Sequence, residues 1–233
     1  MVIQEIREKV AYLRNFVTDQ RDRLFNKLIQ ERTGYMTLVL EDLYQPHNIS
    51  AILRSCDCCG VQHVHVIERE NRFQDNTEIS LGAREWLTLH HHHGEKDNTL
   101  AAIRTLKEQG YRIIATTPRE KEVMIEDIDL HRGKMAFFLG TELTGLSEKA
   151  LTMADEYVKV PIYGFTESYN VSVCATLLMY SVAQRLRQSA VDWHLSEEEQ
   201  QRVLFAWYTN SIKASTQILK RYDEEQKKPP ANR

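Results

Sequence analysis

The 233-residue sequence predicts an α/β fold: a mostly parallel sheet with helices on both faces, extended by helices at each end of the chain. Short apolar runs alternate with longer segments of helical periodicity, hydrophobic residues make up 42% of the chain, and no internal repeat interrupts the alternation. Strands that alternate with helices form parallel sheets covered on both faces. A chain of this length and composition can bury one sizeable core.

The first 34 residues are predicted to form a helical extension. Ile6, Val10 and Leu13 recur at helical spacing, and Thr33-Gly34 ends the pattern. Four of the five arginines in this segment are interleaved with acidic side chains: Arg7, Arg14, Arg21 and Arg23. Charges arranged in this way form either a solvated helix face or a local basic patch.

Residues 35–190 are predicted to form the main domain. Its strand-like runs are residues 37–40, 64–67, 112–116, 136–139 and 157–160, and the helical stretches between them include residues 48–59, 99–109 and 170–187. Pro46 disfavours helix before it, and Asn48, two residues later, is predicted to be the N-cap of its helix. Residues 191–233 form a second helix-rich extension that ends in a charged, proline-containing tail.

Composition excludes several classes of protein. A net charge of -3 argues against non-specific coating of nucleic acid, which depends on phosphate neutralisation. The chain has neither an apolar run of about 18 residues nor an apolar signal core, so we expect a cytoplasmic protein without a membrane span. No metal site is predicted, because Cys56, Cys58 and Cys59 would splay over different faces of a helix, and the run at residues 90–93 indicates a polar strand end or loop.

Ligands of open parallel sheets bind beyond the carboxyl ends of the strands, so the loops that leave strands are informative. The first is QPHNISAILRSCDCCG, residues 45–60. His47, Asn48 and Arg54 should cluster near a strand's carboxyl end, which points to a functional site. The structural alternative for Arg54 is an ion pair with Asp57 three residues on.

The second loop, LGTELTGLS, covers residues 139–147. Gly140 and Gly145 have the spacing of a phosphate-binding P-loop, but Leu146 stands where that loop requires lysine. Glu142 would also repel phosphates. We therefore expect a ligand with amino, hydroxyl or cationic groups, held by backbone that the two glycines allow to approach closely.

The third loop begins the stretch VPIYGFTESYNVSVCATLLMYSVAQR, residues 160–185. Pro161 and Gly164 bend the chain after a strand, and Ser168 or Asn170 can cap the helix that follows. The apolar face of this helix is predicted to include Val171 and Leu177. Taken alone, the stretch is typical of a capped structural helix.

Taken together, the three loops resemble the three motifs of the SPOUT RNA methyltransferases, and more narrowly the TrmH branch of ribose 2′-O-methyltransferases. The matching patterns are N-x-x-A-x-x-R-S, F-L-G-x-E-x-x-G-L-S and V-P-x-x-G-x-x-x-S-x-N-V-S-V-x-A, within residues 36–187. The resemblance implies a carboxyl-terminal trefoil knot and a homodimer formed through the knot region. It also implies S-adenosylmethionine as the cofactor, bound in a bent form by the knotted loops.

The resemblance assigns residues to three groups. Those implied in catalysis are Asn48, Arg54, Glu142, Ser168 and Asn170. Those implied in cofactor binding are Thr116, Leu139, Gly140, Gly145, Val160, Gly164 and Tyr169, the last being a departure from the leucine common in relatives. RNA-binding candidates are His47, Arg7, Arg14, Arg21, Arg23, Arg185 and Arg187, because phosphate contacts position a substrate even on a slightly acidic protein.

Short helical extensions at both ends resemble the plan of the enzymes that methylate the ribose of a guanosine in the tRNA D-loop, so tRNA is the predicted substrate. Ribosomal RNA is the alternative substrate. A SPOUT-fold RNA-binding protein without activity is the alternative of another class. The presence of Arg54, Glu142 and Asn170 favours an enzyme over that alternative.

Overall fold

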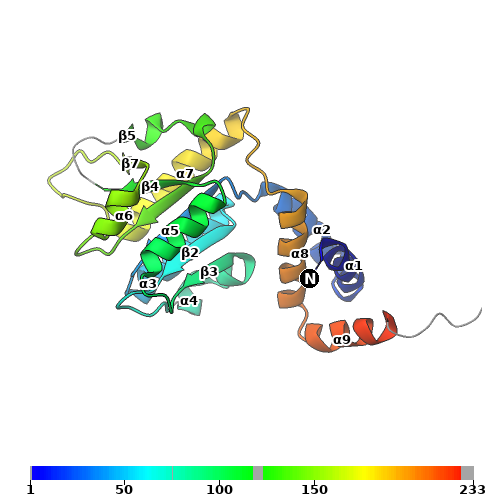
Figure 1. Ribbon diagram of the computed structural model, residues 1–233. Helices are drawn as coiled ribbons and strands as arrows, with labels where there is room; N and C mark the ends of the chain where they lie inside the picture. The colour runs from blue at the N-terminus through cyan, green and yellow to red at the C-terminus, as the bar shows by residue number, and fades with distance from the viewer. Residues whose placement is uncertain (1, 75, 118–122, 227–233) are drawn as a thin grey trace, which may run out of the picture. The chain divides into compact units, whose positions relative to one another are not determined.

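The computed structural model describes residues 2–74, 76–117 and 123–226. The chain forms two compact units (Figure 1). Residues Thr33–Trp193 form the first, here called the sheet unit, and the segments Met1–Arg32 and His194–Arg233 together form the second, the helical unit. The two terminal extensions predicted from the sequence therefore belong to one body.

Seven parallel strands build the sheet in the order β3-β2-β1-β6-β4-β7-β5. Their bounds are β1 Met36–Glu41, β2 His63–Ile67, β3 Thr88–His92, β4 Arg112–Thr116, β5 Val123–Met124, β6 Met135–Leu139 and β7 Glu156–Lys159. The five strands expected from the sequence agree with β1, β2, β4, β6 and β7 to within one residue at each end. The two additional strands, β3 and β5, lie at the edges of the sheet.

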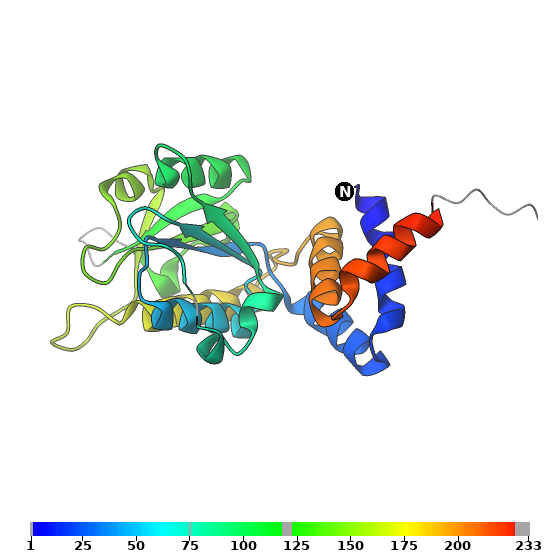
Figure 2. The same ribbon diagram turned by 90° about the horizontal axis from the view of Figure 1, so that it is seen from below.

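Helices cover both faces of the sheet, as predicted. Helices α3 Pro46–Cys59 and α7 Val171–Gln188 pack on one face through a core that contains Leu38 and Phe137. Helices α5 Asn98–Glu108 and α6 Glu148–Met153 pack on the other, against Val39 and Phe138. Alternate residues of β1 and β6 thus enter opposite cores, which explains why Leu38–Leu40 of β1 and the whole of β6 are continuous apolar runs. Figure 2 shows the sheet between these two layers.

Short elements complete the sheet unit. They are α4 Thr77–Ser80 and three 3₁₀ turns, Ala83–Trp86, Ile125–Asp127 and Leu130–Arg132. One local prediction is wrong: α3 begins at Pro46, so its N-cap is Gln45 and Asn48 already lies within the first turn. Proline suits the first helical position because its missing N–H would have no partner there.

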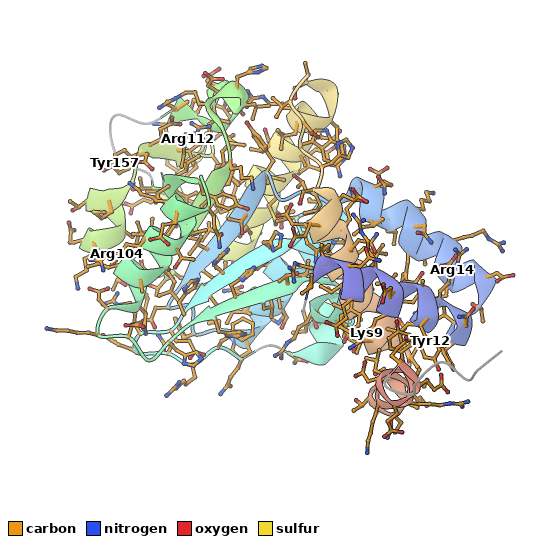
Figure 3. All side chains as sticks on the ribbon, turned by 45° about the vertical axis from the view of Figure 1, so that its right-hand side comes forward. Lys9, Tyr12, Arg14, Arg104, Arg112 and Tyr157 are labelled. Atoms are coloured by element: carbon orange, nitrogen blue, oxygen red, sulfur yellow. The ribbon has the colours of Figure 1, made fainter. Side chains whose placement is uncertain are left out.

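In its described residues, the helical unit contains four helices, α1 Ile3–Leu13, α2 Asp19–Leu28, α8 Glu197–Ser211 and α9 Ser215–Gln226, with 3₁₀ turns at Arg14–Phe16 and Ile29–Glu31. Its core contains Phe25, Trp207 and Tyr208. The Tyr208 hydroxyl donates to Asp22, which also pairs with Arg14 at 2.8 Å. Figure 3 labels Lys9, Tyr12 and Arg14 on this unit. Side chains from both ends of the sequence therefore share one core and one polar network.

Within the described ranges, no helix is both long enough and apolar enough to cross a membrane.

Candidate active site

The three predicted loops leave the carboxyl ends of β1, β6 and β7, and β4 lies between β6 and β7. In a parallel sheet these ends share one edge, where ligands of open α/β folds bind. Thr116, the last residue of β4, donates its hydroxyl to the carbonyl of Phe138 on β6 and so ties two of these strand ends together. A ligand-binding site is therefore expected at this edge of the sheet.

A chain of polar side chains joins the three loops at this edge. The Asn48 amide nitrogen donates to the Glu142 carboxylate, and the Asn170 amide nitrogen donates to the Asn48 side-chain oxygen at 3.2 Å. Asn48 comes from α3, Glu142 from the loop after β6 and Asn170 from the start of α7. One residue from each sequence motif thus enters a single cluster, called here the Asn–Glu–Asn cluster.

Further contacts fix the orientation of this cluster. Asn48 also donates to the Gln45 side-chain oxygen at 2.8 Å, so both of its amide hydrogens have acceptors. Asn170 is the N-cap of α7, as predicted, and its oxygen accepts from the Ser172 amide at 2.9 Å and the Ser172 hydroxyl at 2.7 Å. Because every contact is polar and specific, the cluster holds the Glu142 carboxylate in a defined direction.

The glycines of the second loop serve a tight turn. Thr141 and Gly145 exchange backbone hydrogen bonds at 3.1 and 3.0 Å, and Gly145 has a φ of +69°. A Cβ on Gly140 would lie 2.2 Å from the Gly145 carbonyl carbon and 2.3 Å from the Leu146 nitrogen, distances that no side chain tolerates. The G-x-x-x-x-G spacing therefore belongs to a closed turn that brings the Leu139–Gly140 backbone to the site.

The third loop projects from the sheet unit. Val160 is half-buried, whereas Gly164 and Ser168 are exposed, and within the described residues the Ser168 side chain makes no hydrogen bond. The Tyr169 hydroxyl donates to the Pro161 carbonyl at 3.1 Å and closes the loop on itself. The loop therefore brings Asn170 into the cluster but leaves Ser168 outside it.

Arg54 and His47 are exposed on α3. Among the residues that the structure describes, the Arg54 guanidinium has no hydrogen-bond or ion-pair partner, so the ion pair with Asp57 considered as the structural alternative does not form. Of the three residues expected to cluster at this strand end, only Asn48 is hydrogen-bonded in the Asn–Glu–Asn cluster. An exposed arginine whose five donors have no partner in the described structure is available for an anionic ligand such as phosphate.

The remaining RNA-binding candidates have different environments. Arg7 pairs with Glu197 at 2.7 Å, Arg14 pairs with Asp22, and Arg21 reaches the Ser211 hydroxyl at 3.5 Å. Arg23 is exposed on α2. In the sheet unit, Arg185 donates to the carbonyls of Ile125 and Ile128 at 3.0 and 2.6 Å, and Arg187 lies over the Trp193 ring and near the Cys59 carbonyl. Arg185 and Arg187 thus have structural contacts in α7.

The histidines expected at a strand end form β3 and pack against β2. His63 and His90 join ring nitrogens at 3.1 Å, His65 and His92 join theirs at 2.9 Å, and the His65 ring stacks on that of His90 with centroids 4.4 Å apart. Burial, with the neighbouring imidazoles, lowers the pKa of His65 to about 2 and that of His92 to about 4. Neutral stacked rings act as packing groups here, and no group of three His, Cys, Asp or Glu side chains in the described ranges could hold a metal ion.

Sequence reasoning missed two acidic residues that follow each other at the end of β1. Glu41 and Asp42 are 2% and 7% exposed, and both carboxylates accept hydrogen bonds from loops at the carboxyl edge. Two adjacent acidic residues at the end of an apolar strand could have indicated these buried carboxylates. A carboxylate is buried only when hydrogen-bond donors satisfy it, so such a position predicts nearby donors.

Comparisons with known proteins agree with this geometry. Residues 35–180 match the model of the SpoU rRNA Methylase family. The chain is 40% identical over 209 residues to the tRNA (guanosine(18)-2'-O)-methyltransferase of Borreliella burgdorferi, covering 90% of this chain and 94% of that protein. It is 34% identical over 192 residues to the protein of the same name from Thermus thermophilus, covering 82% and 96%. The crystal structure of the A. aeolicus TrmH/SpoU tRNA modifying enzyme superposes with a TM-score of 0.73 at 25% identity, covering 83% and 98% of the two chains.

A parallel sheet whose three motif-bearing loops meet at the carboxyl edge, together with these similarities, places the chain in the class of SPOUT methyltransferases, TrmH branch, in agreement with the resemblance noted in the sequence. Within that class, the chain belongs to the SpoU rRNA Methylase family.

Proposed function

We propose that the protein transfers the methyl group of S-adenosylmethionine to the ribose 2′-oxygen of a guanosine in the D-loop of tRNA. The observation that carries this proposal is the 40% identity, over nearly the full length of both chains, with a tRNA (guanosine(18)-2'-O)-methyltransferase. The Asn–Glu–Asn cluster supplies an ordered site for that chemistry. Such an enzyme works in the cytoplasm with its tRNA.

The donors and acceptors at the carboxyl edge suit S-adenosylmethionine. The turn at residues 140–145 offers backbone groups, and its only charged side chain is the Glu142 carboxylate, which attracts a cationic ligand and repels a polyphosphate. Leu139, buried at the end of β6, adds an apolar surface next to those polar groups. When bound, the cofactor supplies a methyl group on a positively charged sulfur.

We assign the alignment of the reaction to the polar residues of the site. Transfer needs the attacking oxygen, the methyl carbon and the sulfur in line, and holding reactants in such a geometry removes much of the entropic barrier. Asn48 and Asn170 fix the loops in relation to each other, and Glu142 orients the groups beside it. Ser168 lies outside this cluster in the described structure, and we propose that it joins the site when ligands order the third loop.

Arg54 is the proposed anchor of the substrate phosphate beside the reacting ribose. A guanidinium keeps its charge because its pKa exceeds about 12, so it acts by binding phosphate and by favouring ionisation of the nearby 2′-hydroxyl. Replacing Arg54 by alanine should lower kcat at least about 100-fold while the Kd for S-adenosylmethionine changes less than about twofold.

The experiment combines radiolabelled S-adenosylmethionine with separate pools of unmodified tRNA and ribosomal RNA, followed by nucleoside analysis and by calorimetry of cofactor binding. The proposal expects 2′-O-methylguanosine in the tRNA pool only. Product in the ribosomal pool alone would move ribosomal RNA to first place. Cofactor-independent RNA binding without product would support the non-catalytic alternative, and loss of cofactor binding in the Arg54→Ala variant would contradict the role given to Arg54.

The helical unit is the proposed docking surface for tRNA away from the reacting nucleotide. Arg23 is exposed on α2, and Arg21 and Arg7 lie at the surface of the same unit with weak or exposed partners. Arg14 is exposed too, but its partner Asp22 is buried and also accepts from Tyr208, so Arg14 is a weaker candidate. Exposed ion pairs contribute little stability, so they can exchange for phosphate contacts at low cost. Arg185 and Arg187 are weaker candidates, because carbonyl contacts already use their guanidinium groups.

We further propose that the protein is a knotted homodimer that pairs through α7. Leu177, which the sequence placed in the buried face of α7, is 40% exposed, and Val173 and Tyr180 are 46% and 60% exposed. The three residues have i, i+4, i+7 spacing and form one apolar stripe, which a second copy would cover. Sedimentation analysis at micromolar concentration tests the dimer, and a monomeric mass would contradict it.

A further inference from the structure

Glu41 is a buried carboxylate that accepts three hydrogen bonds. It is the last residue of β1 and is 2% exposed. One carboxylate oxygen accepts from the Thr99 hydroxyl at 2.6 Å and from the Ser147 hydroxyl at 2.7 Å, and the other accepts from the Ser147 amide at 2.8 Å. A carboxylate removed from water is stable only with partners of this kind, so its position is strongly determined.

The donors belong to two helix starts on the same face of the sheet. Ser147 is the N-cap of α6, and its hydroxyl also accepts from the Ala150 amide at 3.2 Å. Thr99 is the second residue of α5. Glu41 therefore joins the starts of two helices through its hydrogen bonds.

These contacts fasten residues 139–147, here called the cofactor loop, to β1 at both ends. The near end is held by the strand register, in which Leu139 pairs with Leu40. The far end is held by the two bonds from Ser147 to Glu41, the next residue of β1. The same strand leads directly to Gln45 and Asn48. One strand end therefore sets the position of the cofactor loop in relation to the Asn–Glu–Asn cluster.

We propose that Glu41 is a positioning residue of the methyl-transfer site, which holds the cofactor loop in the shape that receives S-adenosylmethionine. This inference rests on the proposed function. Glu41 acts through Ser147 and touches neither ligand, so it differs from the motif residues that line the site.

The test compares Glu41→Gln with Thr99→Val. A glutamine has the size of the native side chain but presents an NH₂ group in place of one oxygen, so it cannot satisfy both Ser147 donors and Thr99. Thr99→Val removes only the bond to α5 and keeps the shape of the side chain. The expected result is a rise of at least about tenfold in the Kd and KM for S-adenosylmethionine in Glu41→Gln, with less than about a twofold change in Thr99→Val.

Amide exchange of the unliganded proteins gives a second readout, which does not depend on methyl transfer. Exchange at Thr141, Gly145 and Ser147 should accelerate in Glu41→Gln and stay unchanged in Thr99→Val. If Glu41→Gln does not fold, Ser147→Ala takes its place, since it removes the hydroxyl bond to Glu41 and should also weaken cofactor binding and speed exchange in the loop.

Two outcomes overturn the inference: unchanged cofactor affinity and loop exchange in Glu41→Gln, or an equal loss of affinity in Thr99→Val at a similar melting temperature. Failure of the proposed function has a different result, because a wild-type protein that transfers no methyl group to RNA can still show faster loop exchange in Glu41→Gln.

Discussion

Asp42 combines two unusual properties in one residue. Its φ is +59°, a conformation that costs energy for a residue with a side chain, and its carboxylate is 7% exposed. One carboxylate oxygen accepts from the backbone amides of Arg69, Glu70 and Asn71, each at 2.9 Å. The strained backbone aims the carboxylate at three consecutive amides and so fixes the loop that follows β2.

Replacing Asp42 by alanine should lower the free energy of unfolding by about 3 kcal/mol, because alanine leaves the amides without an acceptor and tolerates positive φ poorly. Asn is the matched control: it keeps one side-chain oxygen and adopts positive φ more readily, so Asp42→Asn should cost about 1 kcal/mol. Urea denaturation measures both values. Equal losses in the two variants would show that charge, and not the acceptor or the backbone, dominates at this position.

Asn170 and Asn48 show which residue roles could be predicted from the sequence and which could not. Of the two residues expected to cap α7, Ser168 and Asn170, the structure shows Asn170 in that role, which depends only on neighbouring residues. The same expectation for Asn48 is wrong, because α3 begins at Pro46 and has Gln45 as its N-cap. The Asn48 amide instead donates to Glu142, which is 94 positions away in the sequence. No local pattern contains a partner at that separation, so the motifs could place the two residues in one site only through resemblance to a family.

The strands also divide into those that the local sequence predicts and those that depend on contacts with distant residues. The buried strands β1, β4 and β6 were predictable because parallel strands covered on both faces consist of continuous apolar residues. Strand β3 was not, since Thr88–His92 lies at an edge and is half-buried, and its polar residues carry no strand pattern. It is a strand because its histidines stack on those of β2.

That stacking makes the β2–β3 pair sensitive to acid. The pKa of His65 is about 2 in the folded protein, far below the usual 6.5, so the unfolded chain binds more protons as the pH falls. The contribution of neutral His65 is therefore complete above pH 6.5 and is lost as the pH falls from about 6.5 toward 2. One pKa unit corresponds to about 1.4 kcal/mol, so stability should drop by about 2 kcal/mol between pH 7 and pH 5 from this group alone.

Urea midpoints measured across that pH range check the prediction. The variant His65→Leu should show a clearly flatter pH dependence, and His93→Gln, which changes a neighbouring histidine of the same run, should keep the wild-type slope. An unchanged slope in His65→Leu would assign the acid sensitivity to other groups.

At the scale of the whole molecule, the helical unit depends on both ends of the chain. Trp207 of α8 is 2% exposed, its ring lies 5.6 Å from that of Phe25 on α2, and the Arg32 guanidinium lies over it at 5.2 Å. Truncating a buried tryptophan to alanine costs about 3–5 kcal/mol, a large part of the stability of a small unit. We expect Trp207→Ala to remove amide protection from α1, α2 and α8.

Hydrogen exchange read by mass spectrometry distinguishes the two units in this variant. Peptides from β1 and β6 should keep their wild-type protection, because those strands belong to the other core. Phe16→Ala is the control within the helical unit: this ring is 45% exposed, and its loss should cost roughly 1 kcal/mol or less. Equal loss of protection in β1 and in α2 would mean that the chain unfolds as one cooperative body.

Because the helical unit contains both terminal segments, it cannot be completed until the second segment has been synthesised. The ribosome adds 162 residues between residue 32 and residue 194. At about 5–20 residues per second, this takes roughly 10–30 seconds. During that interval Phe25 has no Trp207 to cover it, whereas the sheet unit becomes complete before the last helices emerge. The nascent chain therefore carries an uncovered N-terminal apolar surface until α8 has been made, and that surface is where a chaperone would bind first.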